Sequence, residues 1–182
     1  MAARILFLCL LFLSACTPST PESRFSDERQ KLTHRALKKF IVAMQEKGLT
    51  PAGIGEGINH RNNKQNCLEV VFDIDELPSV EFARELIVEA LQQFLHTINY
   101  TYGIEEYLSE YPFPLKFIQV AILGRNETGL CAVWNREEML MYDKHQPGES
   151  FNRKTVCEET YDEALKILAQ QKHSAVRPSL SL

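Results

Sequence analysis

The chain has 182 residues, and its 20 lysines and arginines against 24 aspartates and glutamates give a formal net charge of −4. This acidic balance argues against nucleic acid as a partner and against broad electrostatic attachment to anionic lipid, because both need a basic surface. The length is sufficient for one domain with its own hydrophobic core.

The first 15 residues have the three parts of a secretory signal. Arg4 supplies a positive charge, residues 5–13 form an apolar run, and the small residues Ser14 and Ala15 precede Cys16. A helix that crosses a bilayer needs roughly 20 apolar residues, so this run is too short to remain as a membrane span. We therefore expect residues 1–15 to be a signal peptide that is removed.

The residues Leu13-Ser14-Ala15-Cys16 resemble the lipobox of bacterial lipoproteins. The resemblance implies that a diacylglyceryl group is attached to the Cys16 sulfur, that a peptidase cuts before Cys16, and that the new amine is acylated. Two or three acyl chains hold a protein stably at a bilayer, at about 0.8 kcal/mol per buried methylene. Because Thr17 rather than aspartate follows Cys16, the resemblance also implies delivery to the outer membrane in many Gram-negative bacteria.

The rest of the chain predicts a tether and a single domain. Residues 16–25 are rich in proline, serine and threonine, which favours a flexible tether. We expect a single α+β domain over residues 26–172 and a loose tail over residues 173–182. The domain is similar to small bacterial lipoproteins of unknown function through segments 83–86 and 111–113, a resemblance that implies no activity.

The first half of the domain predicts a helix and then a β-hairpin. Apolar residues recur at helical spacing over residues 26–47. Residues 49–59 and 67–75 predict two strands, because apolar and polar side chains alternate in the second one. Three glycines at alternate positions are expected to make the first strand irregular: Gly53, Gly55 and Gly57.

A second helix follows Pro78 and Ser79 and extends to Ile98, with a wide apolar stripe that is typical of a central core element. A short helical turn is expected over residues 104–111. Strands are expected at 115–123, 130–135 and 139–142.

Thr155 and Glu158 match a capping box that would begin a last helix. Taken together, the elements predict an α+β fold, with an antiparallel sheet of about four or five strands and helices packed on one face.

The sequence contains none of the motifs that mark common catalytic or cofactor sites. It has no phosphate-binding loop, no serine-nucleophile elbow, no His-Glu-x-x-His and no Cys-x-x-Cys, and its five histidines are scattered. We expect no metal and no cofactor.

Three cysteines remain once Cys9 is removed with the signal and Cys16 is lipidated: Cys67, Cys131 and Cys157. Export permits a disulfide, and an odd number allows at most one. The sequence does not choose the pair.

Cys157 supports an alternative function. A cysteine in the first turn of a helix has a lowered thiol pKa, which would suit a thiol-dependent or hydrolytic envelope enzyme. Such an enzyme also needs a histidine nearby, and His145 is the nearest in sequence.

Two further features suggest binding. Tyr100, Tyr102, Tyr107 and Tyr111 are clustered after the second helix. Clustered aromatic residues form a partner-binding surface in some proteins and cover the edge of the core in others, and both interpretations stay open. The glycine-rich strand suggests a small-ligand site lined by its other side chains: Ile54, Glu56 and Ile58.

The sequence as a whole favours a membrane-anchored envelope lipoprotein with a non-enzymatic binding or assembly domain and a protein partner in the envelope. The alternatives are the Cys157 enzyme and the small-ligand binder.

Overall fold

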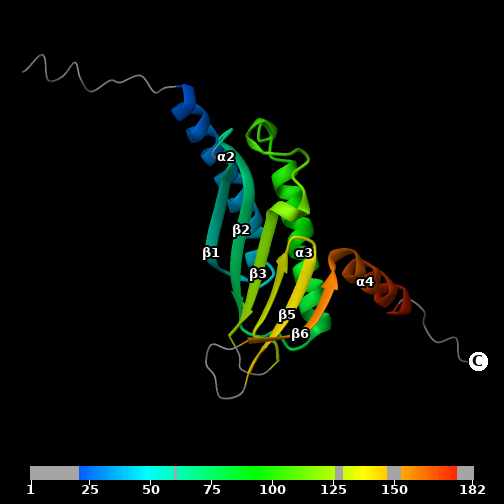
Figure 1. Cartoon of the computed structure of the whole chain (residues 1–182). Coiled ribbons are helices and arrows are strands. Elements are labelled where there is room, and N and C mark those ends of the chain that lie inside the picture. The colour runs from blue at the N-terminus through cyan, green and yellow to red at the C-terminus, as the bar shows by residue number, and fades with distance from the viewer. Residues whose placement is uncertain (1–20, 60, 126–128, 147–152, 176–182) are drawn as a thin grey trace, which may run out of the picture.

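The computed structural model describes residues 21–59, 61–125, 129–146 and 153–175. These residues form one mixed sheet and three α-helices (Figure 1). The sheet has the strand order β1-β2-β3-β4-β5-β6. Its strands are β1 (Thr50–Asn59), β2 (Lys64–Ile74), β3 (Ile118–Gly124), β4 (Ala132–Arg136), β5 (Met139–His145) and β6 (Arg153–Thr160).

The predicted α+β class is confirmed, but the predicted sheet of four or five antiparallel strands is wrong in two respects. The sheet has six strands, and β2 and β3 pair in parallel while all other neighbours are antiparallel. The parallel pair arises because α3 (Val80–Asn99) connects the two strands. A crossover helix returns the chain to the end of the sheet where it started, so the next strand has the same direction.

The helices lie on one face of the sheet, as expected (Figure 1). α2 (Pro21–Gln45) and α3 pack against each other, and α4 (Tyr161–Ala175) contacts α3 and β6. Phe40 of α2 stacks on Phe94 of α3 with ring centroids 4.3 Å apart and meets the edge of Phe72 of β2 at 5.6 Å. These three buried rings join two helices and the sheet in one core.

The two faces of the sheet differ in what covers them. Along β2, Leu68, Val70 and Phe72 are fully buried beneath the helices. The alternate residues Glu69 and Val71 point to the opposite face and are only partly buried. No described helix covers that face, which we call the uncovered face (Figure 1).

The helix that leads into the domain begins earlier than the sequence indicates. α2 starts at Pro21 and not at Ser26, so the second half of the expected tether at residues 16–25 is helical. Proline is well suited to the first turn of a helix, because its missing N–H has no intrahelical partner there. The rest of that tether, residues 1–15 and Cys16 itself lie outside the described residues.

The last helix begins later than expected. Thr155 and Glu158 lie in β6, and the expected capping box there is wrong. Thr160 and Glu163 form the capping box of α4: the Thr160 N–H donates to the Glu163 carboxylate at 2.8 Å, and the Glu163 N–H donates to the Thr160 hydroxyl at 3.2 Å. Pairing with β5 extends the strand through the first Thr-x-x-Glu motif, and the helix begins at the second.

Other boundaries differ by a few residues. The turn expected at 104–111 is a 3₁₀-helix over Glu105–Tyr107, and a second one over Leu115–Phe117 precedes β3. α3 has the expected N-cap, because the Ser79 hydroxyl accepts from the Phe82 N–H at 3.3 Å. α4 continues to Ala175, into the expected tail, and residues 176–182 lie outside the described ones. Within the described ranges, no helix has both the length and the apolar character that crossing a bilayer requires.

Candidate functional site

The uncovered face has a row of residues that crosses all six strands. The pairing registers place Val71 beside Ala121, Ala121 beside Trp134, and Trp134 beside Met141. We call the complete set the central row: Gly53, Val71, Ala121, Trp134, Met141 and Glu158. Because neighbouring strands are about 4.8 Å apart, the row is roughly 24 Å long. Its four middle members are apolar and partly exposed.

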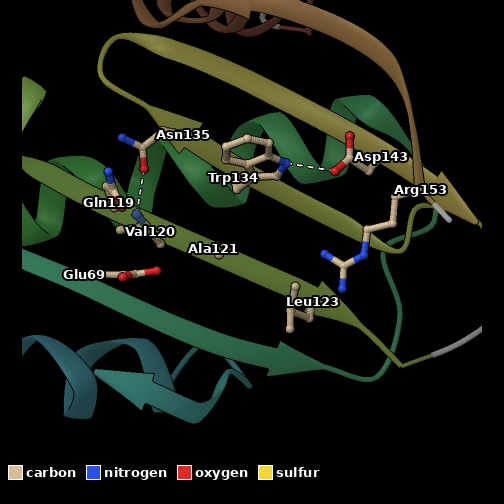
Figure 2. Close-up of a pocket in the computed structure, with 9 residues that line it drawn as sticks. All are labelled: Glu69, Gln119, Val120, Ala121, Leu123, Trp134, Asn135, Asp143 and Arg153. Carbon is tan, nitrogen blue, oxygen red and sulfur yellow. Dashed lines mark hydrogen bonds between the residues drawn. The ribbon is translucent and has the colours of Figure 1, made fainter. Parts of the chain in front are cut away.

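A shallow hollow of about 320 Å³ lies over the central row (Figure 2). Ala121, Leu123 and Trp134 supply its apolar part. The other residues that line it are Glu69, Gln119, Val120, Asn135, Asp143 and Arg153. A second hollow of about 340 Å³ adjoins the row at Met141 and Glu158, near the turn between β4 and β5.

Asp143 holds the indole of Trp134 in place. The Trp134 Nε1–H donates to one carboxylate oxygen of Asp143 at 2.9 Å (Figure 2). The Thr155 hydroxyl donates to the other carboxylate oxygen at 2.8 Å. Asp143 is 6% exposed, so both bonds are shielded from water. The largest ring of the central row is therefore fixed before any ligand arrives.

Asn135 joins β3 to β4 at the edge of the hollow. Backbone pairing between these strands covers only Ala121–Leu123 of β3. Beyond these residues, the buried side chain of Asn135 makes the hydrogen bonds between the strands. Its Oδ1 accepts from the Val120 N–H at 2.6 Å and its Nδ2 donates to the Ile118 carbonyl at 2.7 Å. The side chain thus replaces ladder bonds where the two strands separate.

Opposite charges border the hollow. Arg153 is exposed, and its guanidinium makes no hydrogen bond or ion pair with another residue of the described segments. At the other border the Glu69 carboxylate lies over Gly55, where an added Cβ would be 2.8 Å from Oε2. The glycines of β1 therefore leave room for the side chains of β2.

The ligand site expected along Ile54, Glu56 and Ile58 does not coincide with either hollow. The register places Ile54 opposite Val70 and Glu56 opposite Leu68, on the side of the sheet away from the central row. The glycines between them, and not these side chains, face the hollow's side of the sheet.

The three cysteines of the described domain are free thiols. Cys67 lies in β2 and Cys157 in β6, while Cys131 lies between β3 and β5, to which its backbone is bonded. At least one strand separates each pair, so their Cα atoms are at least about 9.6 Å apart. A disulfide needs a Cα separation below about 7 Å, so none of the three pairs left open by the sequence can form.

Cys157 does not have the environment of a catalytic thiol. It lies in β6, not in the first turn of a helix, and that expectation is wrong. Burial raises the pKa of its thiol, and the neighbouring Glu159 carboxylate raises it further. His145 pairs with Arg153, four residues along β6 from Cys157, which corresponds to roughly 13 Å. The arrangement therefore lacks both the lowered pKa and the nearby base.

The four tyrosines have two different environments. Tyr107 packs on Phe25 with ring centroids 4.6 Å apart. Tyr100, Tyr102 and Tyr111 are 77%, 91% and 55% exposed. Tyr107 thus covers the edge of the core, whereas the other three rings are exposed, and a partner-binding role for them stays a prediction.

A buried polar cluster connects α3 to β5 and β6 on the covered face. Arg84 Nε donates to Glu159 Oε1 at 2.7 Å, and the Tyr142 hydroxyl donates to the same carboxylate oxygen. Burial raises the pKa of Tyr142, and its bond to Glu159 adds to the rise. All three side chains are buried, which makes this cluster a structural connection rather than an accessible site.

The sequence did not indicate the residues around the hollow. The alternation of Ile118, Val120 and Ile122 with Gln119 and Ala121 could have identified the two faces of β3, but the neighbours of Trp134 depend on the strand order. In the described parts of the chain, no group of three or more histidines, cysteines or carboxylates is placed to hold a metal.

No protein-family model, curated protein or solved structure matches this chain. Its function has to be inferred from its own residues.

Proposed function

We propose that this protein is a bacterial envelope lipoprotein, held at its membrane by acyl chains on Cys16, whose domain binds a protein partner through the uncovered face. Residues 13–16 and the acidic composition support attachment by lipid rather than by charge. Thr17 favours the outer membrane if the cell is Gram-negative.

The central row is the observation that carries the binding proposal. It presents Val71, Ala121, Trp134 and Met141 in a continuous line on a face without a described helix. The neighbouring row on the same face is more polar, with Asp73 and Asp143, and the charged Arg153 lies beside it. An apolar centre with a polar border is the usual composition of a protein interface, and aromatic residues and arginine are enriched there.

The shape of the site favours a protein over a small ligand. Small-molecule pockets enclose most of their ligand, whereas both hollows are shallow and lie on one sheet face. A row roughly 24 Å long matches the width of a contact patch of about 800 Å². Because Asp143 fixes the Trp134 ring in advance, little side-chain entropy is lost when a partner binds.

Photocrosslinking in the producing cell tests the binding proposal. A photoreactive residue at Ala121 should give one discrete crosslinked product, and the same residue at the exposed Lys38 of α2 should give none. The product should disappear when Trp134→Ala and Arg153→Ala are combined in the Ala121 background. Absence of a product at Ala121, or the same products at both positions, would contradict binding through this face.

A further inference from the structure

The three exposed tyrosines lie at the end of the domain where α2 begins. The Phe25–Tyr107 contact joins their loop to the first turns of α2, and Arg35 Nη2 donates to the Tyr102 carbonyl at 3.0 Å. The turn between β1 and β2 lies at the same end, because Arg29 Nη1 donates to the Asn63 carbonyl at 2.8 Å. Figure 1 shows the start of α2, this turn and the loop after α3 together at one end.

The covalent chain limits how far this end can be from the lipid. Only four residues separate Cys16 from Pro21, the first residue of α2. Five extended residue steps span at most about 18 Å. Phe25 is roughly one helical turn, about 6 Å, further along. If Cys16 is the lipidated residue, the Phe25–Tyr107 contact is therefore within about 24 Å of the anchor.

We infer that Tyr100, Tyr102 and Tyr111 rest on the headgroup layer of the membrane that holds the anchor, an inference that depends on the proposed lipidation of Cys16. Tyrosine is enriched at membrane interfaces because its ring is apolar and its hydroxyl bonds to headgroups. Three partly or largely exposed tyrosines in one loop otherwise leave a large apolar area in water.

Two of these rings are held in position. The Tyr100 ring packs on His96 of α3 with centroids 4.5 Å apart, and the Tyr111 hydroxyl donates to the Asn99 carbonyl at 3.1 Å. They are presented as a fixed surface rather than as free side chains, which lowers the entropy lost on contact.

The charges of the loop indicate which headgroups it suits. Glu105 and Glu106 are exposed, whereas Lys116 is paired with Glu110 at 2.8 Å. Arg61, in the turn between β1 and β2 at the same end, is also exposed. Charges of both signs give no excess of cations for anionic lipid, so we expect a zwitterionic surface.

The contact also restricts the orientation of α2. Arg35, which binds the Tyr102 carbonyl, is 14 residues beyond Pro21, a rise of about 21 Å along α2. An upright α2 would keep Tyr102 well above the bilayer. The helix must therefore lie inclined to the membrane.

Quenching by brominated lipid tests this contact. Wild type has a single tryptophan, Trp134, on the uncovered face. The combined variant Trp134→Phe with Tyr102→Trp places the single tryptophan at the tyrosine end, and Trp134→Phe with Val156→Trp places it at another exposed position. The lipidated proteins are reconstituted in phosphatidylcholine vesicles with and without brominated acyl chains, after circular dichroism has verified that each is folded.

We expect brominated lipid to quench the tryptophan fluorescence of the Tyr102→Trp protein roughly twofold, and not to quench wild type or the Val156→Trp protein. If the Tyr102→Trp protein floats with the vesicles but is not quenched, the membrane contact is overturned and the anchor stands. Protein that does not float would overturn both. Equal quenching of the Val156→Trp protein would overturn the assignment to the tyrosine end, and quenching that increases with added phosphatidylglycerol would overturn the zwitterionic surface.

Discussion

The Tyr142 hydroxyl of β5 donates a hydrogen bond to the Glu159 carboxylate of β6 in the buried layer beneath α3. Arg84 of α3 binds the same oxygen, so one carboxylate joins a helix to two strands. These two strands also carry Met141 and Glu158 of the central row, on the opposite face. The buried cluster therefore supports the surface that we propose binds a partner.

Removing the cation of this cluster should destabilise the domain strongly. Arg84→Met leaves the Glu159 carboxylate buried without its ion pair, and the free energy of unfolding should fall by about 3–5 kcal/mol. The Lys47–Glu89 pair has a similar separation of 2.6 Å but is half exposed, so Lys47→Met should cost less than about 1 kcal/mol. Urea unfolding of both variants measures the difference. Equal losses of unfolding free energy in the two variants would show that burial of the ion pair does not determine its contribution to stability.

The raised pKa of Tyr142 gives a pH dependence of known sign. The folded protein holds the neutral phenol, whereas the unfolded chain ionises near the ordinary tyrosine pKa of 10.0. Tyr142 therefore contributes fully to stability below pH 10, and the contribution is lost as the pH rises above that value. The stability difference between wild type and Tyr142→Phe should shrink steadily above that pH. Tyr102→Phe, at an exposed position, is the control variant in the same unfolding series.

Asn135 should contribute more to stability than an exposed asparagine. Asn135→Ala leaves the Val120 N–H and the Ile118 carbonyl without partners in a buried place, which should cost about 2–4 kcal/mol. Asn62 makes one exposed bond to the Lys64 N–H, so Asn62→Ala should cost less than about 1 kcal/mol. Thermal unfolding compares them. A small effect at Asn135 would mean that β3 and β4 do not need the side-chain bridge.

Alanine substitutions at Gly129 and Gly48 distinguish the cost of a strained backbone conformation from the cost of a steric clash. Both have positive φ, 95° and 84°, but an added Cβ would clash with the Leu77 carbonyl oxygen at Gly129 and would meet nothing within 4 Å at Gly48. Gly48→Ala should therefore cost about 1–2 kcal/mol, from conformation alone. Gly129→Ala should cost clearly more, as a larger fall in melting temperature. The reverse order would contradict the close approach of Gly129 to the Leu77 carbonyl.

The thiols should react slowly in the folded protein. Burial raises the pKa values of Cys67, Cys131 and Cys157, so little thiolate is present at about neutral pH. Iodoacetamide labelling of the domain, followed by peptide mass analysis, should be slow at all three sites and fast in urea. Rapid labelling of Cys157 alone in the folded state would restore the thiol-enzyme alternative.

The sequence predicts the elements whose signals are local. The Ser79 cap, the stripe of α3 and the alternation in β2 were sufficient to place a helix and a strand, because each depends on neighbours in the chain. The Thr155–Glu158 motif was misleading, since pairing of Cys157 with Tyr142 outweighs a local capping preference.

Features that depend on strand order were not predictable. Trp134 and Asp143 are nine residues apart and meet because β4 and β5 are neighbours. The parallel β2–β3 pair sets Ala121 beside Val71, and no local pattern indicates that pairing. The sequence indicates the tyrosine cluster, but only the contact of Tyr107 with Phe25 distinguishes the packed ring from the exposed ones.

The mass of the amino-terminal peptide from membrane-extracted protein tests the central proposal most directly. We expect a peptide that begins at Cys16 and carries a diacylglyceryl group on sulfur, with an acyl group on the amine, and Cys16→Ser should lose both and leave the membrane fraction. A peptide with an unmodified Cys16, or one that begins upstream of it, would contradict the lipid anchor.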